Sequence, residues 1–286
     1  MKTIADFFHR DTNTFTYVVH DPQTKDAIII DPVLDFDPHS FSISHKSINA
    51  IVDYLQQAKL KPGLIIDTHV HADHMTGAFE LKKKLRIKSA IGKGFFISQE
   101  HFATYYEIDP SAYEPPYDLY LLDGQEVSCG SITLKALCTA GHTPTCMSFV
   151  IEDAVFVGDT LLQPSLGCGR CDFPAGSAAK LYDSVTEKLY ALPDATRVFV
   201  GHDYPNDKGQ VLSETTIAIS KQSNTMIPAS ISKDDFILNR QKRDKTLAAP
   251  RLLTHAMQVN ILGGQLPKKS KIGRPFLFMP LINHEL

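Results

Sequence analysis

The sequence contains no hydrophobic run long enough to cross a membrane. A spanning helix needs about 20 consecutive apolar residues, and polar or charged residues interrupt every apolar run well before that length. The first residues, Met1–Asp6, also lack the apolar stretch of a signal peptide. We therefore expect a protein of the cytoplasm that has no membrane partner.

Cysteine is scarce and irregularly placed. The chain has five cysteines, which are Cys129, Cys138, Cys146, Cys168 and Cys171. A secreted disulfide framework uses an even number of cysteines in a short chain. An odd number in a long chain predicts reduced thiols, in keeping with a cytoplasmic location.

The sequence also lacks an excess of basic charge. Its 29 Lys and Arg residues are outnumbered by 32 Asp and Glu residues, which gives a formal net charge of -3. Such a chain has no basic field with which to hold a phosphate backbone, so we expect no nucleic-acid partner. Small anionic ligands stay possible, because a bound metal ion supplies positive charge locally.

What is present is the composition of a globular protein, with 43% hydrophobic and 21% charged residues in 286. β-branched and aromatic runs predict eight strands: Phe15–Val19, Ala27–Ile30, Leu64–Ile66, Leu119–Leu122, Ile132–Ala136, Met147–Ile151, Ala154–Val157 and Val198–Val200. The continuous run from Ile28 to Ile30 favours a strand buried on both faces. The alternation of Ile132, Leu134 and Ala136 favours a strand with one solvated face.

Helical patterns alternate with these strands. Two apolar helical faces are Ile48, Ile51, Val52 and Leu55, and Leu181, Val185, Leu189 and Leu192. The second follows Ser177, a predicted N-cap. This mixed order predicts an α/β fold in which helices cover sheets.

Two segments do not follow the strand and helix alternation. Phe95–Asp118 is aromatic and interrupted by proline, which predicts an ordered loop or short helices that can overhang a site. From about Lys208 the strand pattern stops, and helix-compatible sequence runs to Ala249 before an irregular tail. We interpret residues 1–286 as a single domain with a core of about 12–205 and an extension of about 206–286.

The strongest chemical signal is a run of three histidines and one aspartate within six residues, His69, His71, Asp73 and His74. It follows the apolar run Leu64–Ile66 and precedes the helix-like stretch Ala78–Leu85. Residues two apart on an extended chain point the same way, so His69 and His71 can converge on one ion. The turn into the helix can then bring Asp73 and His74 to the other side. A chance cluster of solvated histidines explains this spacing poorly, whereas a zinc, iron or manganese site explains it well.

Three later residues complete a candidate site. His142 lies in the turn Ala140–Pro144, Asp159 ends the strand Ala154–Val157, and His202 ends the strand Val198–Val200. In α/β proteins, sites are assembled where strands run out into loops. Each residue alone could be a cap or a packing residue, but together with the hexapeptide they predict a metal site.

The hexapeptide HxHxDH, the turn GHTP, the aspartate of GDT and the histidine of GHDY, in this order, resemble the metallo-β-lactamase superfamily. The resemblance covers about residues 12–205. It implies a sandwich in the order αβ/βα, two mixed β-sheets flanked by helices, with a metal site at one edge. It does not imply lactamase activity, since function belongs to the site and not to the fold.

Within the superfamily, the segment Gly167–Phe173 is informative. Its start, GCGR, is similar both to glyoxalase II hydrolases and to persulfide dioxygenases of the ethylmalonic-encephalopathy type, whereas Asp172, Phe173 and Tyr204 resemble the dioxygenases alone. Two features depart from the pattern of the mammalian-type dioxygenases. The spacing from Asp159 to Arg170 is longer than theirs by about two residues, and Cys171 stands in place of their small polar residue. Both resemble a bacterial branch of dioxygenase-like proteins, as do Pro250–Leu252 and Gln258–Asn260.

That resemblance implies one Fe(II) per chain, bound by His69, His142 and Asp159. The implied reaction is oxidation of glutathione persulfide, or a similar small persulfide, by O2 to sulfite and thiol in sulfide detoxification. The residues that would orient ligands or substrate are His71, Asp73, His74 and His202. Arg170 and Tyr204 would hold the substrate, with Tyr204 also close to the chemistry. Alternatively, Arg170 pairs only with a nearby carboxylate such as Asp172.

A rival interpretation is a two-zinc hydrolase of glutathione thioesters or lactones. The first zinc would take His69, His71 and His142, and the second Asp73, His74 and His202, with Asp159 and a hydroxide bridging. A third interpretation, a catalytically idle metal-stabilised binding protein, explains the seven ligands less well, because a structural site needs only four.

Two further features have ordinary explanations that we favour. Cys168 and Cys171 have the spacing of a redox pair, but we expect loop thiols near the site and only secondarily a persulfide carrier at Cys171. Asp31 before Pro32 could touch the site from behind, but we favour a turn-forming aspartate. A homodimer is the default expectation for such an enzyme.

Overall fold

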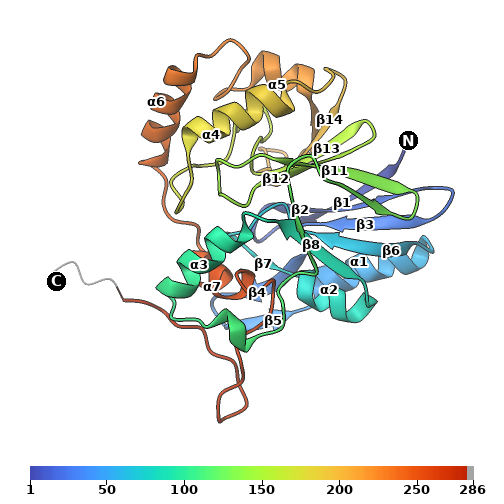
Figure 1. Ribbon diagram of the computed structural model, residues 1–286, viewed down its shortest axis with the longest axis vertical. Coiled ribbons are helices and arrows are strands. Elements are labelled where there is room, and N and C mark those ends of the chain that lie inside the picture. The colour runs from blue at the N-terminus through green and yellow to red at the C-terminus, as the bar shows by residue number, and fades with distance from the viewer. Residues whose placement is uncertain (282–286) are drawn as a thin grey trace.

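The computed structural model describes residues 1–281 as two six-stranded sheets packed face to face, with helices on both outer sides (Figure 1). This is the predicted α/β sandwich. None of the helices in this described part of the chain combines the length and apolarity that a bilayer crossing requires.

The first sheet has the strand order β1-β2-β3-β6-β8-β9. Its strands are β1 Thr3–His9, β2 Thr14–His20, β3 Asp26–Ile30, β6 Lys61–Ile66, β8 Lys88–Gly92 and β9 Leu119–Leu121. The first three strands are antiparallel, and β3, β6, β8 and β9 run parallel. Ile28, Ile29 and Ile30 of β3 are each 0% exposed, which confirms a strand buried on both faces.

The second sheet has the order β10-β11-β12-β13-β14-β15. Its strands are β10 Glu126–Cys129, β11 Ile132–Cys138, β12 Met147–Ile151, β13 Ala154–Gly158, β14 Arg197–Val200 and β15 Glu214–Thr216. Only β13 and β14 pair in parallel. Along β11 the residues alternate between buried and exposed as predicted, with Ile132, Leu134 and Ala136 facing inward.

Helices cover the outer faces of both sheets (Figure 1). On the first sheet lie α1 Lys46–Gln57, α2 Ala78–Leu85, α3 Phe95–Tyr105 and α7 Leu253–Asn260, and on the second α4 Ala178–Asp183, α5 Ile217–Ser223 and α6 Lys233–Asp244. The predicted apolar face of α1 is buried, and Ser177 caps α4 by accepting a hydrogen bond from the Lys180 amide. A π-helical segment, Ser184–Leu189, continues α4.

Smaller elements complete the first layer. A three-stranded sheet is formed by β4 Val33–Asp37, β5 Ser42–Ser44 and β7 Met75–Thr76. The segment between Phe95 and Asp118, predicted as an ordered loop or short helices, forms α3 and the 3-10 turn Pro110–Ala112.

The extension differs from the sequence prediction at two places. Strand β15 lies beyond Lys208, where no further strand was predicted, because its three residues are too few to show a period. The expected irregular tail contains α7, whose Met257 and Val259 are buried among the apolar residues under the first sheet. Both elements owe their structure to tertiary contacts rather than to a local pattern.

Candidate metal centre

The predicted ligands meet at one edge of the sandwich, where loops from both sheets come together. The loop between β6 and β7 contributes His69, His71, Asp73 and His74. The loops that follow β11, β13 and β14 contribute His142, Asp159 and His202. The structure therefore places all seven predicted residues in one cluster, with His69 and His71 ring centroids 4.1 Å apart.

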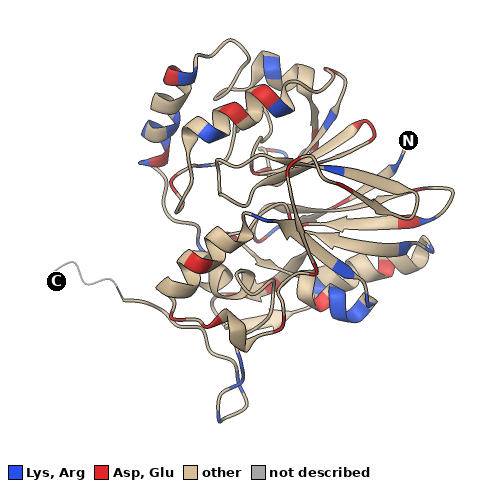
Figure 2. Cartoon of the chain, in the orientation of Figure 1, with Lys and Arg blue, Asp and Glu red and all other residues tan. Residues whose placement is uncertain are grey.

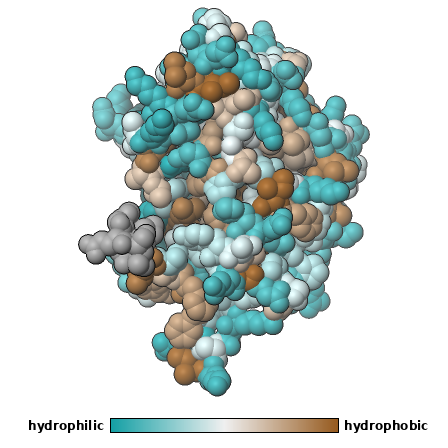
Figure 3. All heavy atoms as spheres, turned by 60° about the vertical axis from the view of Figure 1, so that its left-hand side comes forward, coloured by the Kyte–Doolittle hydropathy of each residue, from teal (hydrophilic) through white to brown (hydrophobic). Residues whose placement is uncertain are grey.

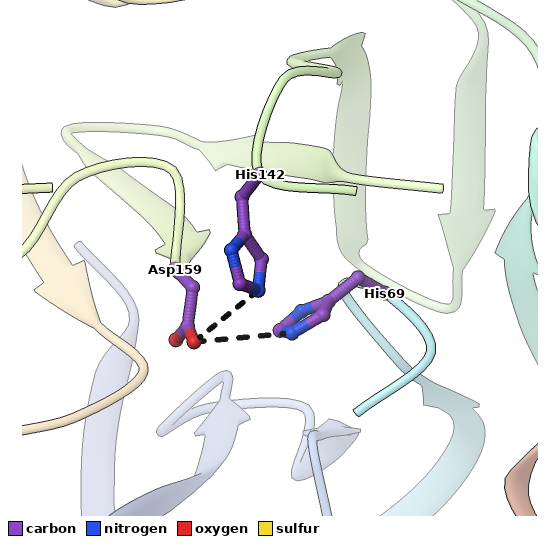
Figure 4. A group of neighbouring side chains, drawn as sticks. All are labelled: His69, His142 and Asp159. Atoms are coloured by element: carbon purple, nitrogen blue, oxygen red, sulfur yellow. Dashed lines mark ion pairs between the residues drawn. The ribbon is translucent and has the colours of Figure 1, made fainter. Parts of the chain in front are cut away.

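Within the cluster, His69, His142 and Asp159 point toward one another from three separate segments (Figure 4). One ligand atom from each lies within 4.8 Å of the other two. Asp159 Oδ2 is 3.6 Å from His142 Nε2 and 4.0 Å from His69 Nε2. These separations are too long for hydrogen bonds, but ligands that each lie about 2 Å from a shared ion are separated by about 3–4 Å.

The hydrogen bonds of the His69 and His142 imidazoles leave the Nε2 atom of each ring free for a metal. His142 Nδ1 donates to the Arg170 carbonyl at 2.6 Å, so Nε2 carries the lone pair. His69 Nδ1 lies 2.9 Å from the Thr68 hydroxyl, which itself donates to Asp31. His69 Nε2 and Asp159 Oδ1 are buried without a hydrogen-bond partner. Buried polar atoms in proteins are normally paired, so these orphaned atoms fit a metal ion.

A second group consists of His71, Asp73 and His74, whose ligand atoms also lie within 4.8 Å of one another. His74 Nε2 and His71 Nδ1 are buried without hydrogen-bond partners. His202 connects the two groups, because its Nε2 is 3.4 Å from both Asp73 Oδ2 and Asp159 Oδ1. Its Nδ1 donates to the Asn13 carbonyl at 3.0 Å.

Burial and neighbouring charges set the protonation states at this edge. Burial lowers the pKa of His69 and of His71 well below the usual range, and neighbouring imidazoles lower it further. Burial alone would raise the pKa of Asp159, but His202, His69 and His142 bring it below its ordinary value. The result is neutral His69 and His71 imidazoles beside an ionised Asp159 carboxylate, which is the ligand state that metals require.

A cleft opens over the cluster, and both predicted substrate residues line it. Tyr204 lies at its mouth with 56% of its surface exposed. The Arg170 guanidinium makes two hydrogen bonds to Asp172, at 2.6 and 2.7 Å, and a third to the Ala248 carbonyl. The pairing with Asp172 is the alternative that we considered for Arg170. The backbone carbonyl of Arg170 also orients His142.

Asp31 meets both interpretations that the sequence offered. It does adopt a left-handed turn conformation, with φ of 50°, but its carboxylate also reaches the site from behind. Oδ1 lies 3.1 Å from His71 Nε2 and accepts a hydrogen bond from the Thr68 amide, and Oδ2 accepts one from the Thr68 hydroxyl. One buried carboxylate thus orients both histidines of the HxH motif, directly at His71 and through Thr68 at His69.

Asp31 belongs to a third group of potential ligands with Asp67 and His71. Hydrogen bonds occupy three of the four carboxylate oxygens, because Asp67 Oδ2 accepts from Thr76 and Tyr117. Burial and the Asp31 charge raise the pKa of Asp67 to about 8. A largely protonated carboxyl is a poor ligand, so this group supports the site rather than forming another one.

Asn260, at the end of α7, is a residue whose contact with the site sequence reasoning missed. Its Nδ2 donates to the carbonyls of His71 and His74 at 2.8 Å, and its Oδ1 accepts from the Thr76 amide at 2.9 Å. The extension therefore fixes the backbone of the ligand loop. No local signal marked this contact, because it joins positions more than 180 residues apart.

The two cysteines of the CxxC pattern are buried free thiols. Cys168 lines the cleft, but burial raises its pKa to about 11. Burial raises the pKa of Cys171 well above its ordinary value too. Reactive cysteines have lowered pKa values, so neither thiol is set up as a nucleophile.

Comparison with known proteins gives one family. The profile of the metallo-β-lactamase superfamily matches residues 9–202. The chain is 39% identical to the protein named Glyoxylase B2 of Dictyostelium discoideum over 275 residues, which cover 95% of this chain and 94% of that one. It is 38% identical to the Beta-lactamase hydrolase-like protein of Xylella fastidiosa strain Temecula1, of which it spans only 64%.

Two further relatives carry the dioxygenase name. Human mitochondrial persulfide dioxygenase ETHE1 is 30% identical over 254 residues, which cover 88% of this chain and 84% of that protein. The crystal structure of ETHE1 from Myxococcus xanthus superposes with a TM-score of 0.75 at 29% identity, covering 92% of this chain and all of that one.

Proposed function

Because this chain belongs to the metallo-β-lactamase superfamily, a family of metal-dependent enzymes, we propose that it is a persulfide dioxygenase with one Fe(II) held by His69, His142 and Asp159. In the reaction, glutathione persulfide, O2 and water yield glutathione, sulfite and two protons. The likeness to persulfide dioxygenases at about 30% identity supports this assignment.

The observation that carries the proposal is the grouping of the ligand atoms. Two imidazoles and one carboxylate form a group of three, while His71 groups instead with Asp73 and His74. Two histidines and one carboxylate on one face are typical of non-haem iron oxygenases. Fe(II) bound there would supply open coordination positions for a persulfide sulfur and for O2.

The residues around this group bind substrate and limit access of water. Phe173 presents its ring to the His142 imidazole at 5.3 Å and forms an apolar wall. Tyr204 offers its hydroxyl at the cleft mouth, where it can hold the substrate. Arg243 and Arg251 also line the cleft, and within residues 1–281 neither makes an ion pair with a carboxylate, although Arg170 and Arg240 do.

These two guanidiniums suit a substrate with carboxylates remote from its sulfur, and glutathione has two. Their hydrogen bonds go to neutral oxygens, from Arg251 to the Asp11 carbonyl at 3.2 Å and from Arg243 to the Thr246 hydroxyl at 3.4 Å. An incoming carboxylate can replace such partners by a charge-assisted pair. Asp73 and His202 would orient the ligands and the bound substrate from the side of the cleft opposite to these two arginines.

A second candidate is a two-zinc hydrolase of glutathione thioesters or lactones. The observation in its favour is the second ligand group, together with His202 Nε2 at 3.4 Å from both Asp73 and Asp159. The similarity to Glyoxylase B2 is consistent with it. In that case Asp159 would bridge the two ions.

The test is metal content and oxygen uptake on one anaerobically purified sample. We expect about one iron per chain and O2 consumption that depends on glutathione persulfide. His142→Ala and Asp159→Ala should abolish this O2 consumption. Two zinc ions per chain, no O2 uptake and turnover of lactoylglutathione would establish the hydrolase instead. Cys171→Ser is the matched control, since a thiol with a raised pKa should leave turnover unchanged.

A further inference from the structure

Helix α6 belongs to the extension, and its inner side carries two charged residues that are almost completely buried. Arg240 is 3% exposed and Asp244 is 5% exposed. Arg240 Nη2 lies 2.6 Å from Asp244 Oδ1, and we call these two residues the α6 ion pair. Figure 2 shows both signs of charge along α6, and the surface in the upper part of Figure 3, where α6 lies, is mostly hydrophilic. Charged residues normally face solvent in this way, so a buried pair on the inner side indicates a specific role.

The α6 ion pair binds both ends of one short segment, residues 168–171, which we call the ligand-support segment. Arg240 Nη1 donates a hydrogen bond to the Cys168 carbonyl at 3.1 Å. Asp244 Oδ2 accepts a hydrogen bond from the Cys171 amide at 3.0 Å. These contacts join positions that are 72 and 73 residues apart in the sequence. Each buried charge is therefore satisfied by the other charge and by one end of the segment.

The two residues in the middle of the ligand-support segment contact two of the proposed metal ligands. The Gly169 amide donates to the Asp159 carbonyl at 2.8 Å, and the Arg170 carbonyl accepts from His142 Nδ1 at 2.6 Å. A Cβ added to Gly169 would overlap the Asp159 carbonyl oxygen and would lie 2.9 Å from His142 Nδ1. The backbone of the segment thus packs directly against both ligands, so its position sets theirs.

Stability of the fold does not by itself explain this ion pair. Taking two charges out of water is costly, and replacing a buried ion pair by apolar residues of similar volume is often neutral or stabilising. In addition, Arg240 Nε is buried without a hydrogen-bond partner among residues 1–281. What the pair provides, and apolar residues cannot, is a donor and an acceptor directed at the backbone of the ligand-support segment.

We propose that the α6 ion pair positions the metal ligands His142 and Asp159 through the ligand-support segment. The pair holds the Arg170 carbonyl where it orients the His142 ring, and the Gly169 amide where it fixes the backbone of Asp159. Hydrogen-bond partners of metal-bound histidines set the ring orientation and the tautomer. This inference rests on the proposed metal ligands but not on the choice of reaction, because the dioxygenase and the hydrolase would both use His142 and Asp159.

The test removes both charges while keeping most of the side-chain volume. In Arg240→Met/Asp244→Leu the segment loses both partners, whereas in Arg240→Met/Asp244→Asn the asparagine oxygen can still accept from the Cys171 amide. Affinity for Co(II), used as a spectroscopic probe of the site, is measured by competition with a chromophoric chelator. The visible absorption of bound Co(II) reports the ligand geometry, and urea unfolding of the metal-free proteins reports their stability.

We expect Arg240→Met/Asp244→Leu to bind Co(II) about tenfold more weakly and with a changed absorption spectrum. Its metal-free stability should be close to that of the wild type. Arg240→Met/Asp244→Asn should have an intermediate affinity, because one end of the segment is still held. Lys233→Ala is the control, since it removes the ion pair between α6 and Asp183 of α4 and should bind Co(II) as the wild type does.

Wild-type affinity and spectrum in both double variants would overturn the proposal. So would an equal loss of affinity in Lys233→Ala, since any loosening of α6 would then explain the effect. If the leucine variant does not fold, the asparagine variant decides, because its affinity is either lower than that of the wild type or unchanged. A wild type that binds no Co(II) would contradict the ligand set itself, on which this proposal rests.

Discussion

Asp31 shows how much one buried side chain can decide at the residue scale. Its carboxylate orients His71 directly and His69 through Thr68. Carboxylates that hold metal-bound histidines fix the ring orientation and tautomer, and their loss typically lowers metal affinity about 10–100-fold. The left-handed backbone at Asp31 is tolerated by asparagine as well, so the amide tests the carboxylate alone.

We therefore expect Asp31→Asn to bind metal about 10–100-fold more weakly while remaining folded. The measurement is competition with a chromophoric chelator, with circular dichroism as the check on folding. Asp35→Asn provides a control, because Asp35 contacts His9 and Ser47 rather than the ligands. Equal metal affinity in Asp31→Asn and wild type would show that the histidines are oriented without this carboxylate.

Arg251 tests the expectation of an anionic substrate. Arg251→Gln should raise KM for glutathione persulfide about tenfold, equivalent to about 1.4 kcal/mol, and leave kcat nearly unchanged, because the guanidinium is remote from the reacting sulfur. The comparison substrate is an uncharged persulfide such as that of 2-mercaptoethanol, for which KM should not change. A fall in kcat with both substrates would place Arg251 in the chemistry or in the fold instead.

At the scale of elements, α1 begins without a side-chain cap of its own, since His45 makes no capping hydrogen bond. Asp35 of β4 takes that role by accepting hydrogen bonds from the Ser47 amide and hydroxyl at 2.9 and 2.8 Å. Burial alone would raise the pKa of Asp35, but the hydrogen bonds from His9 and Ser47 lower it to about 2.

A lowered carboxyl pKa in the folded state gives a defined pH dependence. The stabilisation by Asp35 is complete above its unfolded pKa of about 4 and is lost as pH falls from about 4 to 2. Asp35→Asn should therefore lower the free energy of unfolding by roughly 1 kcal/mol at pH 7, after allowance for solvent screening. Urea unfolding at several pH values should show this difference disappearing near pH 2, and a difference that is constant with pH would contradict the assignment.

Helix α7 supports the metal site from a distant part of the chain. Asn260→Ala would leave the buried carbonyls of His71 and His74 and the Thr76 amide without partners. Unpaired buried groups cost about 1–3 kcal/mol each, so we expect a loss of about 3 kcal/mol in unfolding free energy and weaker metal binding. Gln99→Ala, which removes one hydrogen bond to the Ile261 carbonyl at the same helix, should cost less and leave metal affinity unchanged. Similar losses in both variants would mean that Asn260 acts only through packing.

For the whole molecule, the ligand cluster joins the two sheets, since His69 follows β6 and His142 and Asp159 follow strands of the other sheet. Bound metal should therefore stabilise the entire sandwich by mass action, by about 4 kcal/mol at a thousandfold excess over Kd. Chelation should lower Tm by several degrees, measured by calorimetry. His142→Ala should show the low Tm with or without chelator. A wild-type Tm that does not change on chelation would argue against an ion shared by the two sheets.

Much of the fold was determined by the sequence, because its signals are local. The eight predicted strands and the helices α1 and α2 depend on periods that a few neighbouring residues set, and the structure contains all of them. The ligand types were equally plain, since three histidines and an aspartate within six residues are rare except at metal sites. The strand ends then indicated where His142, Asp159 and His202 would join them.

Only the tertiary structure decided how these groups are arranged. Contacts between distant segments divide the ligands into two groups. Such contacts also place the carboxylate of Asp31 behind the histidines and the amide of Asn260 beneath them. Strand β15 and helix α7 are likewise stabilised by partners far away in the sequence. These contacts form because remote segments pack against each other, and the local periodicity of the sequence does not reveal such packing.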